Sequence, residues 1–316
     1  MCKILTIVVP TYNMEKYLRR CLDSLIIEDK NIFNLLEILV VNDGSKDSSS
    51  EIAHEYSQRH PNIFRVIDKE NGNYGSCVNR GLREATGKFF RILDADDWVN
   101  TEGLSSLIFY LKECCTDIVV TNYVQCFNSG KRIKRIAGKV EYGKAHNLDE
   151  YDLIKHGHTK VIAMHGLTIL TNILREEIYV QQEGISYTDV EFVFFSLMYS
   201  HSIVFLDIEL YQYYLGREGQ TVSQEQEVKH YIDFYKVGHR LVRELIQRDN
   251  GISVVKKDAL ANLILRTVAY NVLAFPLAIY KNPTKEMIDN LKNFDKYISQ
   301  NESLYKYASK QTFRKL

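Results

Sequence analysis

The chain has 316 residues, of which 25% are charged, and its 40 basic residues balance 40 acidic ones. An apolar fraction of 45% is ordinary for a globular protein, so wholesale disorder, collagen and coiled coil are excluded. A formal net charge of zero argues against a dedicated nucleic-acid binder, because such a protein needs a basic excess to neutralise phosphates.

The cysteines and the apolar runs bear on the cell compartment. None of the six cysteines forms a CxxC pair or a metal-ligand spacing, so we expect free thiols in a reducing compartment. The apolar run after Lys3 is too short for a signal peptide, and no run reaches about 18 apolar residues. The sequence therefore predicts a cytoplasmic protein without a membrane-spanning helix.

The first third of the chain alternates strand and helix patterns. Short apolar runs predict buried strands at Ile4–Val9, Leu36–Val41, Phe64–Ile67 and Phe89–Leu93. Helical spacing predicts the intervening helices at Met14–Ile27, Ser48–Arg59 and Tyr74–Ala85. Buried strands separated by helices of about 10–15 residues indicate an α/β fold, with a mostly parallel central sheet flanked by helices. Ligands of such sheets bind at the carboxyl ends of the strands.

The pattern changes further along the chain. A helix is expected at Thr101–Cys115 and strands at Asp117–Tyr123, Ile203–Leu206 and Glu209–Tyr214. The basic stretch 128–139 predicts a hairpin or a mobile loop. After about residue 223 the pattern is wholly helical. We therefore expect an α/β domain over residues 1–223 and a helical C-terminal extension over residues 224–316.

Polar side chains follow three of the predicted strands. The first strand ends in PTYN, the second in VNDGS and the fourth in LDADDW. The ring of Tyr12 can stack on a base, and Asp43 can accept a hydrogen bond from a ring N–H. The carboxylates of Asp94 and Asp96 suit a hard divalent cation, which in turn neutralises a diphosphate. Each group alone is also an ordinary turn sequence, but their convergence on one edge favours a nucleotide site.

These motifs resemble the inverting nucleotide-sugar glycosyltransferases of family 2, which have the Rossmann-like GT-A fold. The resemblance is carried by three segments in order, TIVVPTYNMEKYLRRCLDSL, EILVVNDGSKDSS and NYGSCVNRGLREATGKFFRILDADDW. It is close over residues 4–100 and extends more weakly to about residue 215. It implies a nucleotide-sugar half at about 1–100 and an acceptor half at about 101–223.

The resemblance also implies roles for single residues. Asp43 would contact the base, usually uracil. Asp94 and Asp96 would form the DxD motif and hold Mn²⁺ or Mg²⁺. Arg217 lies in a segment similar to the loop that closes over the donor, although a solvated loop charge is an equal alternative there. The residues expected at the donor are Pro10, Thr11, Tyr12, Glu15, Asp43, Asn79, Asp94, Ala95, Asp96 and Arg217.

The catalytic base of the family lies at a helix start in the second half, where this chain has YTDVEF. Asp189 is the expected base, and Glu191 is the next choice. Thr188 and Val78 depart from the family pattern, because many relatives carry Glu and Arg there. His165 falls where acceptor-side or metal-proximal residues lie, but it also fits a structural histidine.

The expected function is a metal-dependent inverting glycosyltransferase of hexosyltransferase type, with a UDP-sugar as donor and a hydroxyl as acceptor. Asp189 would take the hydroxyl proton while the cation stabilises the departing diphosphate. By resemblance, the product is a bacterial surface polysaccharide, a teichoic-acid-like polymer or a glycoprotein, made on a lipid-linked or protein-linked acceptor. The alternative is a nucleotide-sugar binding module without turnover.

The C-terminal extension is apolar and basic. From Lys256 onward there are eleven Lys or Arg residues against five Asp or Glu residues, and Ala259–Tyr280 is mostly apolar. Two interpretations stay open. The helices bind the anionic inner face of the cell membrane peripherally, or they pack on the α/β domain or in a homodimer.

Overall fold

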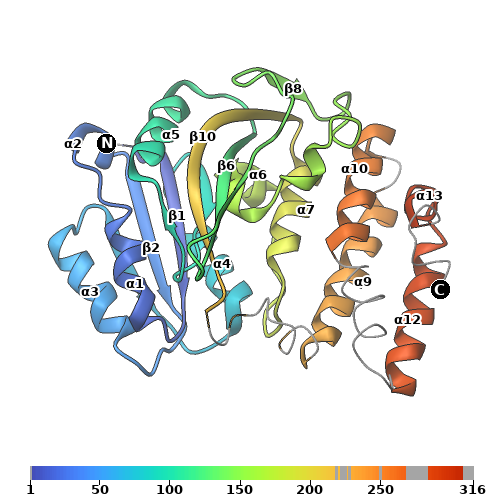
Figure 1. Cartoon of the computed structure of the whole chain (residues 1–316), viewed down its shortest axis with the longest axis horizontal. Helices are drawn as coiled ribbons and strands as arrows, with labels where there is room; N and C mark the ends of the chain where they lie inside the picture. The colour runs from blue at the N-terminus through green and yellow to red at the C-terminus, as the bar shows by residue number, and fades with distance from the viewer. Residues whose placement is uncertain are drawn as a thin grey trace.

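The computed structural model describes residues 2–217, 220, 226, 229–248, 251–267 and 284–308. A ten-stranded sheet forms the centre, flanked by helices (Figure 1), and its main strand order is β3-β2-β1-β4-β9-β6-β10-β5. The strands are β1 (Leu5–Thr11), β2 (Leu36–Asn42), β3 (Phe64–Asp68), β4 (Phe89–Ile92), β5 (Trp98–Val99), β6 (Ile118–Phe127), β7 (Arg132–Arg135), β8 (Ala145–Asn147), β9 (Leu167–Leu170) and β10 (Ser202–Leu215). The helices are α1 (Glu15–Asp23), α2 (Lys30–Phe33), α3 (Ser49–Arg59), α4 (Asn73–Glu84), α5 (Thr101–Glu113), η1 (His158–Lys160), η2 (Met164–Gly166), α6 (Thr171–Glu176), α7 (Asp189–Tyr199), α9 (Tyr231–Gln247), α10 (Val254–Ile264), α12 (Lys285–Ile298) and α13 (Glu302–Ala308).

The first four strands are parallel to one another, and β6 and β10 form a second parallel pair. β1 pairs with β2 and β4, and β2 pairs with β3, all in parallel register. Every residue of β1 and β2 is buried, as expected for continuous apolar runs in the middle of a parallel sheet. The predicted α/β fold with a mostly parallel central sheet is therefore confirmed.

Helix α4 lies directly on β1 because residue 81 is a glycine. A Cβ atom at Gly81 would lie 2.4 Å from Cγ2 of Val8, so a side chain there would push the helix off the strand. This close packing keeps the first turn of α4 near the end of β4, where Tyr74 donates a hydrogen bond to Asp94.

The second half of the sheet differs from the sequence expectation, which contained neither β5 nor β8, and two further differences bear on the core of the sheet. The short strand β9 was not predicted, and it pairs antiparallel with both β4 and β6. The two strands expected at 203–206 and 209–214 form the single strand β10, whose pairing with β6 shifts register between Leu206 and Glu209. A bulge of this kind bends a strand without ending it, so the polar residues at the bend resemble a turn in the sequence.

The described elements after residue 223 are all helices, as predicted. Helix α7 lies between the sheet and the pair α9 and α10, and α12 packs on the far side of α9 (Figure 1). The expected boundary at residue 223 lies outside the described residues, as do residues 268–280 of the apolar stretch. No helix in the described ranges combines the length and the apolar character that a bilayer crossing requires.

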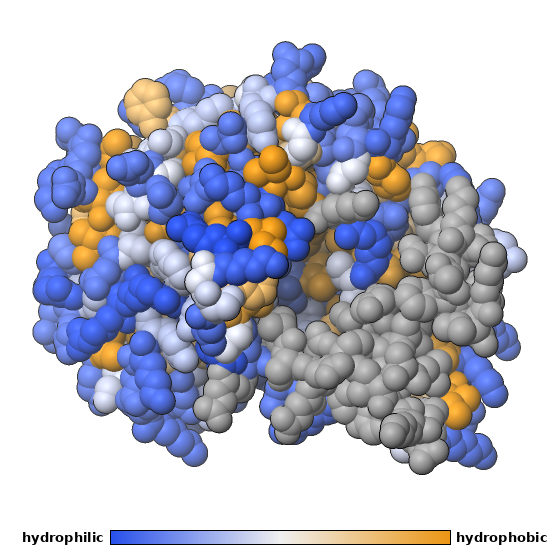
Figure 2. Space-filling model, viewed as in Figure 1, coloured by the Kyte–Doolittle hydropathy of each residue, from blue (hydrophilic) through white to orange (hydrophobic). Residues whose placement is uncertain are grey.

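The basic stretch 128–139 forms a hairpin with β6. Strand β7 pairs antiparallel with β6, and Arg132 and Lys134 both form ion pairs with Glu209. Apolar side chains on the face shown in Figure 2 lie in small patches among hydrophilic ones. All six cysteines are free thiols, as the sequence predicts.

Candidate active site

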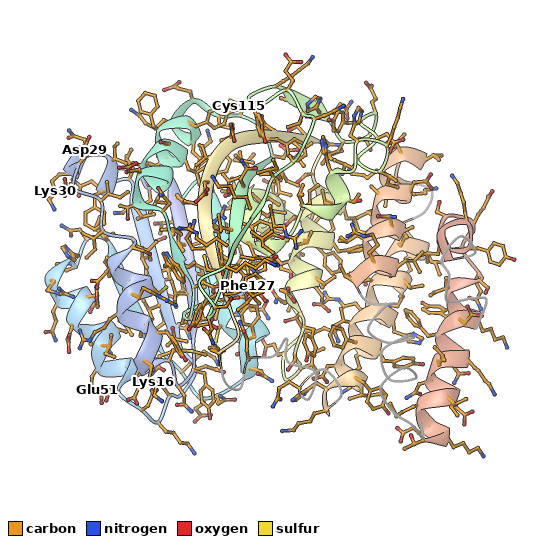
Figure 3. All side chains as sticks on the ribbon, in the orientation of Figure 1. Lys16, Asp29, Lys30, Glu51, Cys115 and Phe127 are labelled. Atoms are coloured by element: carbon orange, nitrogen blue, oxygen red, sulfur yellow. The ribbon has the colours of Figure 1, made fainter. Side chains whose placement is uncertain are left out.

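A cavity of about 510 Å³ lies at the carboxyl ends of β1, β2 and β4. In Figure 3 the labels of Lys16 and Glu51, in the first turns of α1 and α3, mark this edge of the sheet. Asp29, Lys30 and Cys115 mark the opposite edge. Eight of the ten residues expected at the donor line the cavity, and the exceptions are Glu15 and Asn79. The eight are Pro10, Thr11, Tyr12, Asp43, Asp94, Ala95, Asp96 and Arg217.

Tyr12 lies on the cavity wall with 43% of its surface exposed. The next residue, Asn13, has a φ of 54°, and its side-chain oxygen accepts a hydrogen bond of 2.8 Å from the backbone N–H of Lys46. The loops after β1 and β2 are therefore joined. This junction leaves the Tyr12 ring free to meet a flat ligand, such as a base.

Glu15 takes part in the same junction rather than in the cavity. Its Oε2 accepts a hydrogen bond of 3.1 Å from the backbone N–H of Ser48, just before α3. Its own backbone N–H donates to Asp47 at 3.1 Å. The sequence analysis expected Glu15 at the donor site, but in the structure it lies at the junction of the two loops and does not line the cavity.

Asp43 is buried and organises the loop that leads to α4. Its carboxylate pairs with Lys69 and accepts hydrogen bonds of 2.9 Å from the backbone N–H groups of Gly72 and Asn73. The same residue lines the cavity. Asp43 thus shapes the pocket wall and also presents a carboxylate to it.

Asn79 lies away from the cavity, in a contact between α4 and the segment before α7. Its side-chain amide donates to the carbonyl of Gln181 at 2.9 Å and to Glu183 at 2.8 Å, and its oxygen accepts from the backbone N–H of Gln181 at 2.8 Å. Because these contacts occupy the amide, Asn79 joins two parts of the fold where the sequence suggested a nucleotide contact.

Three aspartates follow β4 in different environments. Asp94 accepts a hydrogen bond of 2.9 Å from Tyr74 and lines the cavity, and Asp96 pairs with Arg217. Asp97 is fully buried and accepts from the Tyr211 hydroxyl at 2.6 Å. Burial, and then the nearby charge of Asp96, raise the pKa of Asp94 to about 7 and that of Asp97 well above its usual range.

His165 lies beside these carboxylates, and its ring packs against tyrosine rings. Its ring centroid is 4.1 Å from that of Tyr213 and 4.9 Å from that of Tyr211, and its Nδ1 is buried without a hydrogen-bond partner. Burial lowers the pKa of His165 to about 3, which keeps the imidazole neutral and able to bind a metal.

Asp94, Asp97 and His165 form a group with metal-ligand spacing. One ligand atom from each residue lies within 4.8 Å of the others. Two carboxylates and a neutral imidazole suit a divalent cation such as Mn²⁺, and the unpartnered Nδ1 fits this assignment. The sequence placed Asp94 and Asp96 on the metal. In the structure Asp96 pairs with Arg217 instead, and Asp97 and His165 lie close to Asp94.

Asp189 is the first residue of α7. Burial raises the pKa of its carboxyl, and hydrogen bonds from the backbone N–H groups of Asp189 and Val190 oppose that shift. The charge of Asp189 in turn raises the pKa of Asp94, Tyr74 and Tyr213, all of which line the cavity. Asp189 therefore lies near the acidic end of the cavity, although it is not part of the wall.

Glu191, the alternative base, forms an ion pair and a backbone hydrogen bond away from the cavity. It is fully buried, and its Oε2 accepts from Arg240 at 2.6 Å and from the backbone N–H of Gln182 at 2.9 Å. Burial raises its pKa to about 7. Because Glu191 is engaged by α9, Asp189 is the better placed of the two carboxylates.

The two departures from the family pattern have structural roles. Val78 is fully buried in the face of α4 that meets the sheet. Thr188 is buried, and its hydroxyl accepts a hydrogen bond of 2.8 Å from the side chain of Gln181.

The structure also adds residues that the sequence analysis did not select. Tyr74, Tyr213 and Gln220 line the cavity, and Gln220 donates to the carbonyl of Tyr214 at 2.6 Å. A signal for Tyr213 exists in hindsight, since Tyr211 and Tyr213 alternate along β10 and so share one face. No comparable local signal marks Gln220, which reaches the cavity through the loop that carries Arg217.

Comparison with known proteins agrees with this geometry. The family model described as "Glycosyl transferase family 2" matches residues 6–167. Glycosyltransferase GlyA of Streptococcus pneumoniae is 42% identical over 120 residues, which is 38% of this chain and 16% of GlyA. The minor teichoic acid biosynthesis protein GgaB of Bacillus subtilis is 31% identical over 126 residues, which is 40% of this chain and 14% of GgaB. The chain thus spans only a small part of these two relatives.

Solved structures share the fold over nearly the whole chain. S. aureus TarS in complex with UDP-GlcNAc aligns with a TM-score of 0.58 at 20% identity, covering 94% of this chain and 92% of that one. The mannosyltransferase PcManGT from Pyrobaculum calidifontis, in complex with GDP-Man and Mn²⁺, aligns with a TM-score of 0.57 at 16% identity, covering 95% and 75%. The family match over residues 6–167 shows that this chain belongs to glycosyl transferase family 2, and the shared fold and the cavity at the strand ends agree with that assignment.

Proposed function

We propose that the protein is a metal-dependent inverting glycosyltransferase that moves a sugar from a UDP-sugar to a hydroxyl of a bacterial surface glycan. One observation carries this proposal: the cavity brings together an exposed aromatic ring, an arginine and an acidic cluster, and the buried carboxylate of Asp189 lies near that cluster. These are the groups that a base, a diphosphate, a cation and an acceptor hydroxyl require.

The donor lies along the ends of β1, β2 and β4 in this proposal. The uracil stacks on Tyr12 near Asp43, and the diphosphate lies between Arg217 and the aspartates after β4. TarS supports the choice of donor, because that protein has the same fold and was solved with UDP-GlcNAc.

Asp94 and His165 would hold the cation, Mn²⁺ or Mg²⁺, and the third ligand is either Asp97, which has a carboxylate oxygen within 4.8 Å of ligand atoms of both, or Asp96 of the DxD motif. When bound, the cation supplies positive charge to the departing diphosphate. Arg217 pairs with Asp96, so a donor diphosphate would compete with Asp96 for the guanidinium.

Asp189 acts as the general base. The acceptor oxygen forms a bond to the anomeric carbon, the bond from that carbon to the diphosphate oxygen breaks, and the hydroxyl proton passes to Asp189. Burial raises the pKa of Asp189 and so makes its carboxylate a better proton acceptor. Attack from the face opposite the leaving group inverts the anomeric centre.

The acceptor and the setting are proposed from the relatives. GgaB is named for minor teichoic acid biosynthesis, which supports a polymer of that class made on a lipid-linked acceptor; a protein-linked acceptor is the alternative. We place the catalytic domain at residues 1–223, with the donor half before about residue 100. Synthesis at the inner face of the membrane, a peripheral membrane contact and a homodimer remain predictions from the sequence.

The test is calorimetric titration with UDP, GDP and CDP, first with Mn²⁺ and then with EDTA. We expect UDP to bind selectively and only with the metal. Release of UDP from UDP-glucose, UDP-galactose and UDP-GlcNAc is then measured, which separates an enzyme from a binding module. The matched control is Asp207→Asn, which changes an exposed carboxylate that bonds Asn122.

Selective binding of GDP would mean that the donor is a GDP-sugar and not a UDP-sugar. PcManGT, which was solved with GDP-Man, is an example of such a donor. Binding that ignores EDTA would contradict the metal site. UDP binding without UDP release from any of these sugars would favour the binding module.

A further inference from the structure

The segment from Val180 to Glu191 carries the proposed base, and it is held on one side by α4. A Cβ atom at Gly75 would lie 1.9 Å from the carbonyl oxygen of Gln182, so the segment lies directly against the helix there. The backbone N–H of Gly184 also donates to the carbonyl of Gly72 at 3.3 Å. Helix α4 thus links this segment to the cavity wall.

Helix α9 of the C-terminal region holds the same segment from the other side. Arg240 donates to Glu191 at 2.6 Å and to the carbonyl of Val180 at 2.6 Å, so one guanidinium joins the two ends of the segment. Near the middle, the backbone N–H of Ser186 donates to Asp233 at 3.1 Å. Figure 1 shows α9 next to α7, as these contacts require.

Tyr187, two residues before Asp189, is in an unfavourable backbone conformation. Its φ is 62°, in the left-handed region that residues other than glycine seldom adopt. Its ring stacks on Phe234 of α9, with the centroids 3.7 Å apart and the planes 17° apart. Such a conformation persists only where the surrounding structure holds it, and the stack with Phe234 is a contact that does so.

We propose that α9 positions the catalytic base, with Phe234 and Arg240 as positioning residues that act through Asp189. The proposal rests on Asp189 being the base of the proposed function. Its physical reason is that the turn at Tyr187 sets the direction of the first residue of α7. A small displacement of a catalytic group lowers the rate strongly even when substrate binding is unchanged. The helical region is therefore part of the active-site construction and not a separate appendage.

The first test compares Phe234→Leu with Phe294→Leu. Phe294 is buried in α12 against Tyr235 and His239 of α9, so the control makes the same change in the same helical region without touching the segment. We expect Phe234→Leu to lower kcat for UDP release at least about ten-fold with KM for the donor unchanged. Phe294→Leu should leave both constants near the wild-type values. Equal effects of the two variants would mean a general loss of stability and would overturn the proposal.

A kinetic double-mutant cycle tests whether the effect passes through Asp189. In the Asp189→Asn background the base is gone, so we expect Phe234→Leu to lower the residual rate less than two-fold, within about the error of additivity. A full ten-fold loss in that background would show that Phe234 acts elsewhere. If Asp189→Asn alone keeps the wild-type rate, the proposed base is wrong, which is a different failure from that of the positioning role.

Hydrogen exchange gives a readout that needs no substrate. The amides of residues 182–189 should exchange at least about ten-fold faster in Phe234→Leu than in Phe294→Leu, because local opening is easier once the stack is lost. Unchanged exchange would overturn the proposal even if no sugar donor were turned over.

Arg240 is tested with its partner, because Arg240→Met alone would leave Glu191 buried without a counter-charge. The variant is Arg240→Met combined with Glu191→Gln, and the control is Arg243→Met, an exposed arginine of α9 that pairs with Glu244. We expect the double variant to lose kcat as Phe234→Leu does, with UDP binding kept. Full activity in the double variant would exclude Arg240 from the positioning role.

Discussion

The two sides of the active site are built in different ways. The donor side consists of residues that directly follow β1, β2 and β4, and parallel pairing brings these strand ends together, with Thr11 opposite Asn42. The base side consists of Asp189, whose segment is held by side chains from α4 and α9. Local sequence therefore decides the donor residues at the strand ends, whereas contacts between distant elements decide the base side and bring Arg217 to the donor side.

His165 illustrates the second kind of construction. Its backbone carbonyl accepts a hydrogen bond from Arg91, a fully buried arginine of β4 that also donates to Thr168 at 2.8 Å. The guanidinium fixes η2 against the sheet, and so it fixes the imidazole beside Asp94. A residue in the core thus sets the position of a metal ligand in our proposal.

Asp189→Asn should give the largest effect of the changes tested. Without a general base, transfer is expected to fall about 100-fold or more, while UDP binding stays near normal because the donor side is intact. Steady-state UDP release measures the loss of transfer, and calorimetry measures UDP binding. Asp207→Asn is the control for both. Wild-type turnover in this variant would contradict the division of the site into two sides.

Asp96→Ala should damage the donor side alone. Even residues that only support metal ligands change metal affinity about 10–100-fold, so metal-dependent UDP binding should weaken about 30-fold or more. Titration with Mn²⁺ present measures it. The companion variant Asp97→Asn sharpens the assignment: if it removes metal dependence and Asp96→Ala does not, the ligands are Asp94, Asp97 and His165.

Tyr12→Ala should weaken UDP binding about ten-fold, because stacking of a base on an aromatic ring contributes about 1–3 kcal/mol. The loss should be the same with and without added acceptor. Phe109→Ala, which removes an exposed ring on α5, is the matched control and should leave UDP binding unchanged. Equal binding by the Tyr12 variant and the wild type would mean that the base lies elsewhere in the cavity.

The smallest effect concerns pH. Burial and Asp96 raise the pKa of Asp94 to about 7, and a cation binds only the ionised carboxylate. Lowering the pH protonates Asp94, so metal-dependent UDP binding should weaken about four-fold from pH 8 to pH 6.5, the ratio of ionised fractions for a group of that pKa. Calorimetry at the two pH values measures the change. Tighter binding at the lower pH would contradict the role of Asp94.

Much of the fold could be predicted because its signals are local. The first four strands are short apolar runs closed by polar residues, and each appears at its predicted position. Strand β9 escaped prediction because it lies outside the strand and helix alternation that marks the equally short β4. A motif gives a residue but not the direction of its side chain, and Glu15 and Asn79 each bond a neighbouring segment and do not line the cavity.

The sequence by itself determined the family, the parallel sheet and the residues at the strand ends, since strand, turn and motif lie within a few residues of one another. Only the tertiary structure decided that Asp97 and His165 lie beside Asp94, that Arg217 meets Asp96, and that α9 holds the segment before Asp189. Except for Asp94 and Asp97, which follow the same strand, these groups are separated by tens of residues in the chain. Their contacts depend on how helices and loops pack, which no local pattern encodes.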